Sequence, residues 1–434
     1  MTGVRIGVVG GSIAGCATGV SLARAGFSVT ILERSSRRLE ERGSGIVLPR
    51  ATVDLLKERE LVDPDFAGLP LDAWEWRSRD GGHTGRVAFR QPLGGEAHHW
   101  GSVYRQFRKR VPEELYRAGS TVVSVAEPPG GNVVDVICED GERFEFDVLV
   151  GADGYRSTIR GLVKSAGEPQ YAGYPAWRGL VDEKDIDHAA LAERTVQMVG
   201  VPHGQMAVYM VPGPDGDMRR GHRQLNWLIY DSTVPLDLVR SPDDGSGRLV
   251  VDAVAPGRLS AAQLRHLYEL GDQHLPPWHR QIVLRTPQPY LQALHDLTLD
   301  SYTEGRTCLV GDAATIARPH TASGTSKAIQ DSLALCDALQ SAVSAEAGLA
   351  SYHEARSAAG NALVRLGQDL GDEQVVHAPD WDALDADGYQ ALISGGAGGR
   401  THFARKEPAD PAHPSRTSPE TLPTARPTKE HADR

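Results

Sequence analysis

Three short, glycine-containing segments carry residues that could bind a nucleotide. They are Gly10–Gly15 (GGSIAG), Gly151–Arg160 (GADGYRSTIR) and Gly311–Ala314 (GDAA). Each follows an apolar run, such as residues 4–9 (VRIGVV), of the kind that forms a strand buried on both faces of a parallel sheet. Ligands of open α/β sheets bind beyond the carboxyl ends of the strands, so we expect the three segments to line one cleft.

The first segment fits the GxGxxG fingerprint of dinucleotide-binding units, with Ser12 at the middle glycine. Gly10 would form the tight turn and Gly15 would allow close helix–sheet packing, while Ser12 leaves room for a pyrophosphate at the helix N-terminus. Glu33, at the end of the second strand, would accept hydrogen bonds from the adenosine ribose and disfavours a 2′-phosphate. This unit therefore predicts FAD or NAD. The candidate residues are Gly10, Gly11, Ser12, Ile13, Ala14, Gly15, Glu33 and Arg34.

The third segment, together with the helix after it, would add flavin contacts. Asp312 would accept a hydrogen bond from a ribityl hydroxyl. Small residues at 321–326 open a long predicted helix, whose positive end near Gly324 would face the flavin pyrimidine ring and favour the anionic reduced flavin and its peroxide adduct. The candidates here are Gly311, Asp312, Ala322, Gly324 and Thr325.

The three motifs together resemble those of the class A flavoprotein monooxygenases, the para-hydroxybenzoate hydroxylase-like family, over residues 4 to about 370. Within that family the chain looks most similar to the 2,6-dihydroxypyridine hydroxylase-like branch. The similar segments are residues 43–47 (GSGIV), Trp100 with Tyr104, residues 174–179 (YPAWRG) and residues 225–227 (LNW).

The resemblance implies non-covalent FAD, NAD(P)H as an external co-substrate without a second nucleotide fold, and a C4a-hydroperoxyflavin oxidant. It also implies site residues beyond those above: Asp153 and Gly154 for both FAD and NAD(P)H, Arg42, Gly45 and Ile46 near FAD, and Pro319 at the boundary between flavin and substrate. Three residues depart from the family pattern. Trp100 replaces a frequent FAD-contacting arginine, Thr315 replaces a histidine, and Ala322 replaces a glycine.

Polar residues after position 200, together with Pro319, are candidates for substrate contact and catalysis. A phenol that is ionised by a nearby base reacts faster with an electrophilic oxidant. The catalytic candidates are His203, Tyr209, Asn226, Tyr230, Pro319 and His320. Arg178 could pair with a substrate carboxylate or form an ion pair at a sheet edge, and the sequence does not decide between them.

The pattern of elements predicts an α/β protein of two domains. A Rossmann-like FAD-binding domain with a parallel sheet would take residues 1–169 and 300–393, including C-terminal helices. A substrate domain on a mostly antiparallel sheet would take residues 170–299, where the strands alternate. Residues 394–434 contain several prolines and no periodicity, which predicts a disordered tail.

The composition of the chain limits the kinds of partner that it is expected to bind. The chain has 434 residues and a net charge of −11 with no basic run, which argues against nucleic acid and against an anionic membrane surface. Its beginning does not resemble a signal peptide and no long apolar run suggests a membrane span, so we expect a cytoplasmic protein. The four cysteines fit no metal-ligand spacing. We expect an aromatic small molecule and O2 as partners of a monomer or homodimer, with no metal.

Two other functions share the same cofactor fold. A flavin dehydrogenase or reductase would not incorporate oxygen, and a flavoprotein redox sensor or scaffold would not turn over. The same oxidant could also perform epoxidation or Baeyer–Villiger insertion. Residues 74–76 (WEW) begin like the WxWxIP signature of flavin halogenases, but Arg77 breaks the match.

Overall fold

The computed structural model describes residues 3–37, 39–40, 44–128, 132–163, 167–241, 250–251 and 253–395. All of these described residues belong to one compact unit. Arg42 lies outside the described residues, and so does all of the predicted tail except 394–395, which end a π-helical segment, Gln390–Gly395.

A six-stranded sheet, sheet A, holds the three glycine motifs at its strand ends. Its order is β18-β19-β10-β1-β2-β6, with all neighbours parallel except the β18–β19 pair. The strands are β1 (Arg5–Val9), β2 (Ser28–Glu33), β6 (Tyr116–Ala118), β10 (Val148–Gly151), β18 (Thr303–Glu304) and β19 (Thr307–Leu309). The central strands are apolar because both of their faces are buried.

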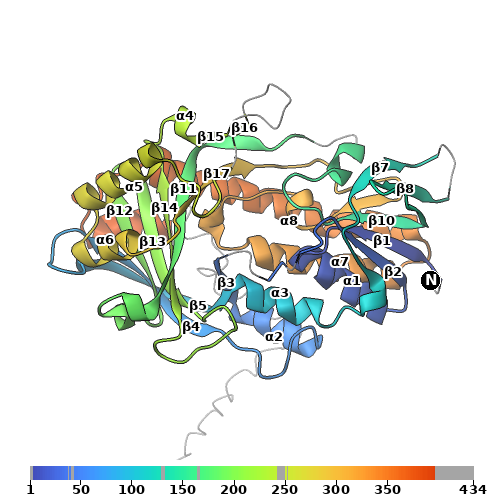
Figure 1. The fold of residues 1–434 in the computed structure, drawn as a ribbon, viewed down its shortest axis with the longest axis horizontal. Helices are drawn as coiled ribbons and strands as arrows, with labels where there is room; N and C mark the ends of the chain where they lie inside the picture. Colours follow the sequence, from blue (N-terminus) through green and yellow to red (C-terminus); the bar gives the residue numbers. More distant parts are fainter. Residues whose placement is uncertain are drawn as a thin grey trace, which may run out of the picture. The chain divides into compact units, whose positions relative to one another are not determined.

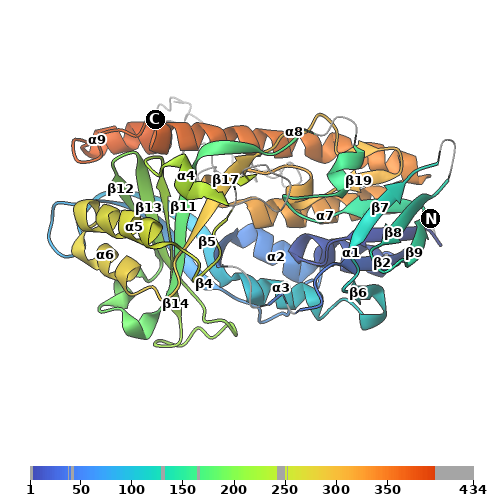
Figure 2. The ribbon, with the colours of Figure 1, turned by 45° about the horizontal axis from the view of Figure 1, so that its top comes forward.

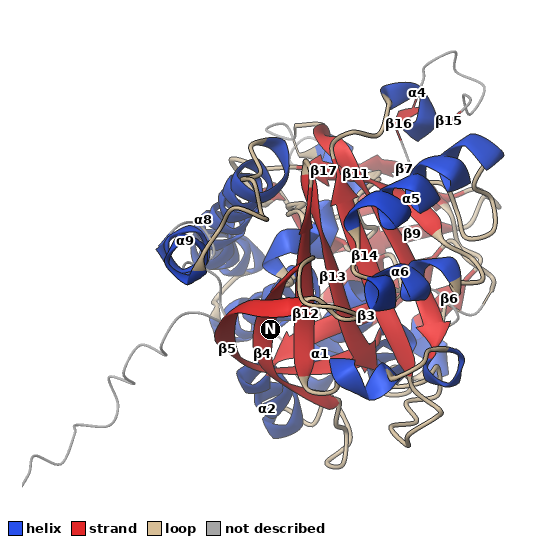
Figure 3. Cartoon of the chain, turned by 90° about the vertical axis from the view of Figure 1, so that its left-hand side faces the viewer, coloured by secondary structure: helices blue, strands red, loops and turns tan. Residues whose placement is uncertain are grey.

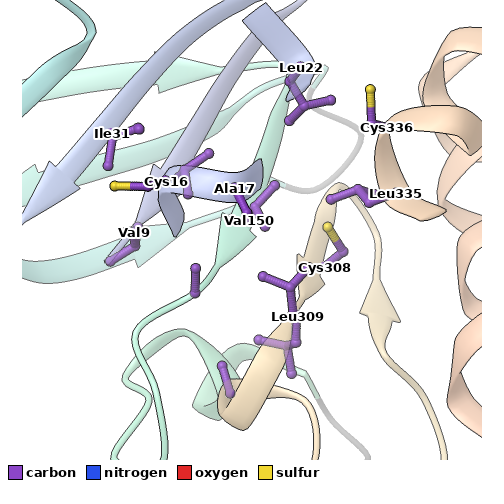
Figure 4. Close-up of a cluster of buried hydrophobic side chains, with 14 of the residues drawn as sticks. Val9, Cys16, Ala17, Leu22, Ile31, Val150, Cys308, Leu309, Leu335 and Cys336 are labelled. Atoms are coloured by element: carbon purple, nitrogen blue, oxygen red, sulfur yellow. The ribbon is translucent and has the colours of Figure 1, made fainter. Parts of the chain in front are cut away.

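Helices α1 (Ile13–Arg24) and α7 (Gly324–Ser341) pack together beside sheet A (Figure 1). Their contact is part of a core that includes Val9, Cys16 and Leu335, with Cys308 from β19 (Figure 4). All four cysteines are buried and free.

An eight-stranded sheet, sheet B, runs in the order β17-β11-β14-β13-β12-β4-β5-β3 and is antiparallel except where β12 pairs with β4. Its strands are β3 (Gly45–Pro49), β4 (Leu69–Ser78), β5 (Arg86–His99), β11 (Gln170–Asp182), β12 (Thr195–Val201), β13 (Gly204–Val211), β14 (Gln224–Asp231) and β17 (Tyr290–Asp296). Helices α5 (Ala261–His274) and α6 (Pro277–Leu284) cover one face of this sheet (Figure 3). Trp177 and Trp227 are buried in the core on that face.

Helix α8 (Ala345–Gly371) packs against α7 and leads to a segment that covers sheet B (Figure 2). That segment comprises a π-helical turn (Asp372–Val376), α9 (Ala386–Tyr389) and the π-helical residues Gln390–Gly395. The remaining helices and strands are α2 (Arg50–Glu58), α3 (Trp100–Arg108), α4 (Leu236–Val239), β7 (Val122–Ala126), β8 (Val134–Cys138), β9 (Arg143–Phe146), β15 (Arg240–Ser241) and β16 (Val250–Val251).

The predicted fold class is confirmed, since a parallel Rossmann-like sheet stands beside a mostly antiparallel one. The division into two domains stays a proposal. Strands β3, β4 and β5 come from the range assigned to the FAD-binding domain but are hydrogen-bonded into sheet B. No helix in the described part of the chain has the length and apolar character that crossing a bilayer requires.

Candidate active site

A cavity of about 570 Å³ lies at the strand ends of sheet A. It is lined by the turn after β1, the end of β2, the loop after β10 and the N-terminus of α7. The predicted cofactor residues on its wall are Gly10, Ser12, Ile13, Ala14, Glu33, Arg34, Trp100, Asp153, Gly154, Asp312, Gly324 and Thr325. The three motifs therefore do converge on one cleft, as the sequence analysis expected.

Two glycines make the turn after β1 possible. Gly10 has a φ of +101°, and a Cβ there would come within 2.5 Å of the Ala152 carbonyl oxygen. A Cβ on Gly15 would lie 1.8 Å from the Gly10 carbonyl oxygen, so Gly15 supports the turn without lining the cavity. Ser12 gives α1 no side-chain cap, which leaves the first N–H groups of the helix available to an anion.

Glu33 is buried and fixes the backbone around the cavity. Its carboxylate accepts hydrogen bonds from the backbone N–H of Gly11 (2.7 Å) and of Ser35 (2.8 Å). A carboxylate has about four acceptor positions, so ribose hydroxyls can still bind to it. Gly11 acts through this bond and is not on the cavity wall.

Asp153 organises its own loop. It accepts hydrogen bonds from the Ser157 hydroxyl (2.5 Å) and from the N–H groups of Thr158 (2.7 Å) and Ile159 (3.2 Å). Burial raises the pKa of Asp153, although these bonds lower it in part. The loop holds Gly154 at a φ of +78° on the cavity wall.

Asp312 faces the cavity from a rigid support. Gly311 before it has a φ of +61° and is bound on both sides: its N–H donates to Asp331 (3.0 Å), and its carbonyl accepts from Lys327 (2.7 Å). Gly311 itself is not on the wall. The depth of Asp312 in the protein raises the pKa of its carboxyl group, and Lys327 opposes this.

A second cavity, of about 800 Å³, lies against the face of sheet B that α5 and α6 leave open. It meets the first cavity at four residues shared by both walls, Trp100, Asp312, Gly324 and Thr325. Its apolar and aromatic wall residues include Ile46, Val47, Trp74, Trp76, Val196, Met198, Ala207, Tyr209, Leu228, Tyr230, Tyr290, Leu294, Ile316, Pro319, Ala322, Leu370 and Ile393.

The geometry fits FAD across both cavities. The smaller one offers a glycine turn and an uncapped helix N-terminus to a pyrophosphate, with Glu33 at the ribose position. The N-terminus of α7, which also lacks a side-chain cap, lies at the junction, where an isoalloxazine ring would be.

His320 is the centre of a hydrogen-bonded cluster on the larger cavity's wall. Its Nε2 lies 2.8 Å from the Tyr174 hydroxyl and its Nδ1 lies 3.3 Å from the Gln205 amide nitrogen. Tyr230 stacks on the imidazole with ring centroids 3.7 Å apart. Burial, assisted by Arg318, lowers the pKa of His320 to about 3, so the ring is neutral.

Two further predicted residues connect β3 to strands β13 and β14 of the same sheet. The Tyr209 hydroxyl donates to the Gly45 carbonyl (2.9 Å), and the Asn226 side-chain oxygen accepts from the Gly45 N–H (2.9 Å). Tyr209 also lines the cavity, but Asn226 does not. Gly45 and Ile46 are thereby held on the wall.

His203 was expected to face the substrate, and this expectation is wrong. It lies in the exposed turn between β12 and β13 with a φ of +59°, and it is not on the cavity wall. The alternation of a strand ends at such a turn, so the side chain no longer follows the inward face of β13.

Family models match two parts of the chain: "FAD binding domain-like" matches residues 171–296 and "FAD binding domain" matches residues 290–366. The 2,6-dihydroxypyridine 3-monooxygenase of Paenarthrobacter nicotinovorans is 29% identical over 337 residues, 77% of this chain and 82% of that protein. A salicylate hydroxylase of Pseudomonas putida is 30% identical over 349 residues, 76% of this chain and 75% of that protein. The chain belongs to the class A flavoprotein monooxygenases. It is thus an FAD-dependent monooxygenase of the aromatic hydroxylase group.

Solved structures agree with this family. The 2,6-dihydroxypyridine-3-hydroxylase of Arthrobacter nicotinovorans superimposes with a TM-score of 0.76 at 26% identity, covering 88% of this flavoprotein and 95% of that chain. A salicylate hydroxylase substrate complex has a TM-score of 0.69 at 20% identity, covering 94% and 100%, which shows a shared fold.

The three departures from the family pattern have local explanations in this monooxygenase. Trp100 begins α3 at the junction and stacks on Tyr104, with ring centroids 5.4 Å apart. Thr315 is buried, with its hydroxyl 2.8 Å from that of Tyr302. Ala322 lines the larger cavity with a φ of +49°, a conformation that favours glycine.

Several wall residues of this flavoprotein were not predicted from its sequence. Gln205 shares the alternation of Tyr209 on β13 and could have been found from it. Gln374 and Ile393 reach the cavity from the segment after α8, and no local pattern marks them.

Proposed function

We propose that this monooxygenase uses NAD(P)H and O2 to hydroxylate a phenolic or heteroaromatic small molecule. The supporting observation is the junction of two cavities at Trp100, Asp312 and the N-terminus of α7. One cavity carries the dinucleotide-binding turn, and the other carries an aromatic wall. FAD, when bound, would be reduced by NAD(P)H and would activate O2 at this junction.

The cofactor roles are part of the proposal. The wall of the smaller cavity would hold the adenosine and pyrophosphate, and Gly45, Ile46 and Ala322 would border the flavin ring from the larger cavity. Asp153 and Asp312 would bind hydroxyl groups of the cofactor. Pro319 would separate flavin and substrate. The apolar remainder of the larger cavity would exclude water from the reacting ring.

His320 suits a positioning role better than that of a proton acceptor. Because burial lowers the pKa of His320 to about 3, its imidazole is a poor acceptor for the proton of a phenol. Both ring nitrogens already contact Tyr174 and Gln205. We therefore assign His320 to holding these two side chains and Tyr230 in place on the substrate wall.

The test uses the purified protein reconstituted with FAD. Phenols and hydroxypyridines should stimulate NAD(P)H oxidation, and mass spectrometry should find one atom of ¹⁸O from ¹⁸O2 in the product. Stimulated NAD(P)H oxidation without labelled product would contradict hydroxylation.

The presence and position of ¹⁸O in the product also distinguish hydroxylation from the alternative functions. A flavin dehydrogenase or reductase would give a product without ¹⁸O. Epoxidation or Baeyer–Villiger insertion would give ¹⁸O in a ring oxirane or an ester instead of a hydroxyl group. A protein that binds FAD but never turns over would favour a redox sensor. The preference for NADH or NADPH follows from the same assay.

A further inference from the structure

We infer that the substrate of the larger cavity carries an apolar arm, a second ring or an alkyl chain, in addition to the ring that reacts beside the flavin. The arm lies over β12 and β4 and ends against the segment that follows α8. This inference rests on the proposed function, because it specifies the substrate of that same site.

One row of paired residues crosses the floor of the larger cavity from strand to strand. Arg178 on β11 pairs with Leu228 on β14, which pairs with Ala207 on β13. Ala207 pairs with Met198 on β12, and Met198 pairs with Trp76 on β4. All five residues line the cavity. Four strand spacings cover about 19 Å along the sheet, so the floor is longer than a single aromatic ring.

The residues that would border the flavin meet one side of this floor. The Arg178 guanidinium on β11 donates to the hydroxyl of Ser44 (2.8 Å), the residue before Gly45. The Gly45 carbonyl accepts from Tyr209 on β13 (2.9 Å), and the Gly45 N–H donates to Asn226 on β14 (2.9 Å). A ring carbon must come within about 3.5 Å of the atom that it reacts with, which places the reacting ring over β11, β14 and β13. The floor formed by β12 and β4 is left for another part of the substrate.

The wall at this far side, which we call the distal end, is apolar. It is formed by Trp74, Trp76, Gln91, Val196, Met198 and Ile393. Of these six, only Gln91 has a polar group without an aromatic ring, and four belong to one buried apolar cluster. At the other side of the floor, by contrast, Arg178 donates to the Gln292 side-chain oxygen (2.7 Å). The wall therefore changes from polar to apolar along the row, and an apolar group is the ligand that its distal end favours.

The segment after α8 closes the distal end. It lies on the face of sheet B opposite α5 and α6, and Ile393 brings it to the cavity wall (Figure 3). Trp381 stacks on Trp76 with ring centroids 4.8 Å apart, and it packs so closely on Gly200 that a Cβ at Gly200 has no room. Trp76 is thus held from behind. An arm that follows the floor would end at Trp76 and Ile393, which set its length.

Binding is measured by calorimetry on the oxidised FAD-loaded protein, with phenol, 4-ethylphenol, 4-butylphenol and 4-phenylphenol as probes. Each buried methylene strengthens binding about fourfold, so affinity should rise along the alkyl series. 4-(4-Aminobutyl)phenol, whose arm ends in a cation, should bind no better than phenol. The change in the flavin spectrum reports the ring beside the flavin and should be the same for all of these probes.

The substitution Met198→Trp fills the distal end. It should weaken 4-butylphenol binding about tenfold and leave phenol binding unchanged. Met218→Trp makes the same change at an exposed residue and is the control.

The substitution Ile393→Ala provides a second variant if Met198→Trp is poorly folded. It lengthens the distal end and should strengthen the binding of 4-hexylphenol relative to 4-butylphenol. Leu392→Ala is its matched control, because Leu392 is the chain neighbour of Ile393 but does not line the cavity.

An affinity that did not rise from phenol to 4-butylphenol would overturn the inference, and so would equal losses for these two probes in Met198→Trp. Tight binding of the aminobutyl probe, or no binding of any probe, would also overturn it. A gain for 4-butylphenol alone identifies the arm as an alkyl chain, and a gain for 4-phenylphenol alone identifies it as a second ring. Because binding needs no turnover, ¹⁸O-labelled product without this rise in affinity would support the proposed function and reject the arm.

Discussion

At the scale of single residues, the site depends on glycines, which have no side chain, as well as on residues with functional side chains. Gly15 has no space for a methyl group, because a Cβ would lie 1.8 Å from the Gly10 carbonyl oxygen. That oxygen belongs to the turn that would face the pyrophosphate.

We therefore expect Gly15→Ala to displace this turn and to lower FAD affinity at least tenfold, measured by fluorescence titration of the apoprotein. Gly94→Ala is the matched control, since a Cβ there meets no atom within 4 Å. Normal FAD affinity in Gly15→Ala would show that the turn does not bind the cofactor.

Residue types and spacing predicted the wall residues of the smaller cavity better than those of the larger cavity. Gly10, Glu33 and Asp312 were identified because their positions after strands have a fixed meaning in α/β sheets. His203 was misplaced and Gln205 was missed, because the chemistry of a substrate wall depends on which face of a strand is inward. That orientation is decided by packing across sheet B.

At the scale of elements, the segment after α8 closes one end of the larger cavity. Trp381 stacks on Trp76 with ring centroids 4.8 Å apart and an interplanar angle of 18°. Its indole N–H donates to the Gly204 carbonyl (3.1 Å). Trp76 lines the cavity, so this contact links the segment to the substrate wall.

Trp381→Ala should lower the free energy of unfolding by about 3–5 kcal/mol, because it leaves a large void beside Trp76. Trp381→Phe keeps the stacking and should cost about 1 kcal/mol for the lost hydrogen bond. Chemical denaturation of both variants gives these values. Equal losses in the two variants would mean that stacking contributes little.

A half-buried histidine–aspartate pair joins β14 to α5 on the opposite side of sheet B. His266 Nε2 lies 2.9 Å from Asp231, which also accepts from Thr233 and Trp177. The bond to Asp231 raises the pKa of His266. Burial acts to raise the pKa of Asp231, but its hydrogen bonds outweigh burial and lower it.

The signs of these shifts fix the pH range in which the pair stabilises the fold. The His266 contribution is complete below its ordinary pKa of about 6.5 and is lost as pH rises through the raised pKa. The Asp231 contribution is present above about pH 4 and is lost as pH falls through the lowered pKa. We expect His266→Gln to cost about 1 kcal/mol more at pH 6 than at pH 9, measured by urea unfolding.

His377→Gln is the control for this pH effect, because His377 and Asp372 form an exposed pair. A loss in His266→Gln that did not change with pH would indicate a packing effect alone.

At the scale of the whole molecule, FAD would contact β1, β2, β10 and the N-terminus of α7 at once. A ligand that binds only the folded state adds about 2.7 kcal/mol of stability at one hundred times its dissociation constant. We expect FAD to raise the melting temperature of the apoprotein in calorimetry. FMN should raise it less, because it lacks the second phosphate that the turn after β1 would bind and the adenosine that Glu33 would bind. Equal shifts would contradict the assigned orientation of FAD.

The arrangement of strands could be predicted from the sequence only where strands that follow one another in the chain also lie side by side in a sheet. Residues 4–33 form one βαβ unit and were predicted well. Helix α3 ends at Arg108, and Pro112 then precedes a short 3₁₀ turn and β6. The joining of β4 to β12 links residues more than one hundred positions apart, which no local pattern reveals.

That parallel joint between β4 and β12 has a consequence for engineering. A chimera that exchanged residues 170–299 with those of a relative would receive five strands of an eight-stranded sheet, and β12 would meet a foreign edge. The wall of the larger cavity in the chimera would also keep the recipient's Ser44, Trp74 and Trp76, because these residues lie outside 170–299. The donor's residues at these three positions would be missing. Grafts that carry residues 44–99 along with 170–299 should fold and transfer substrate choice more often than grafts of 170–299 alone.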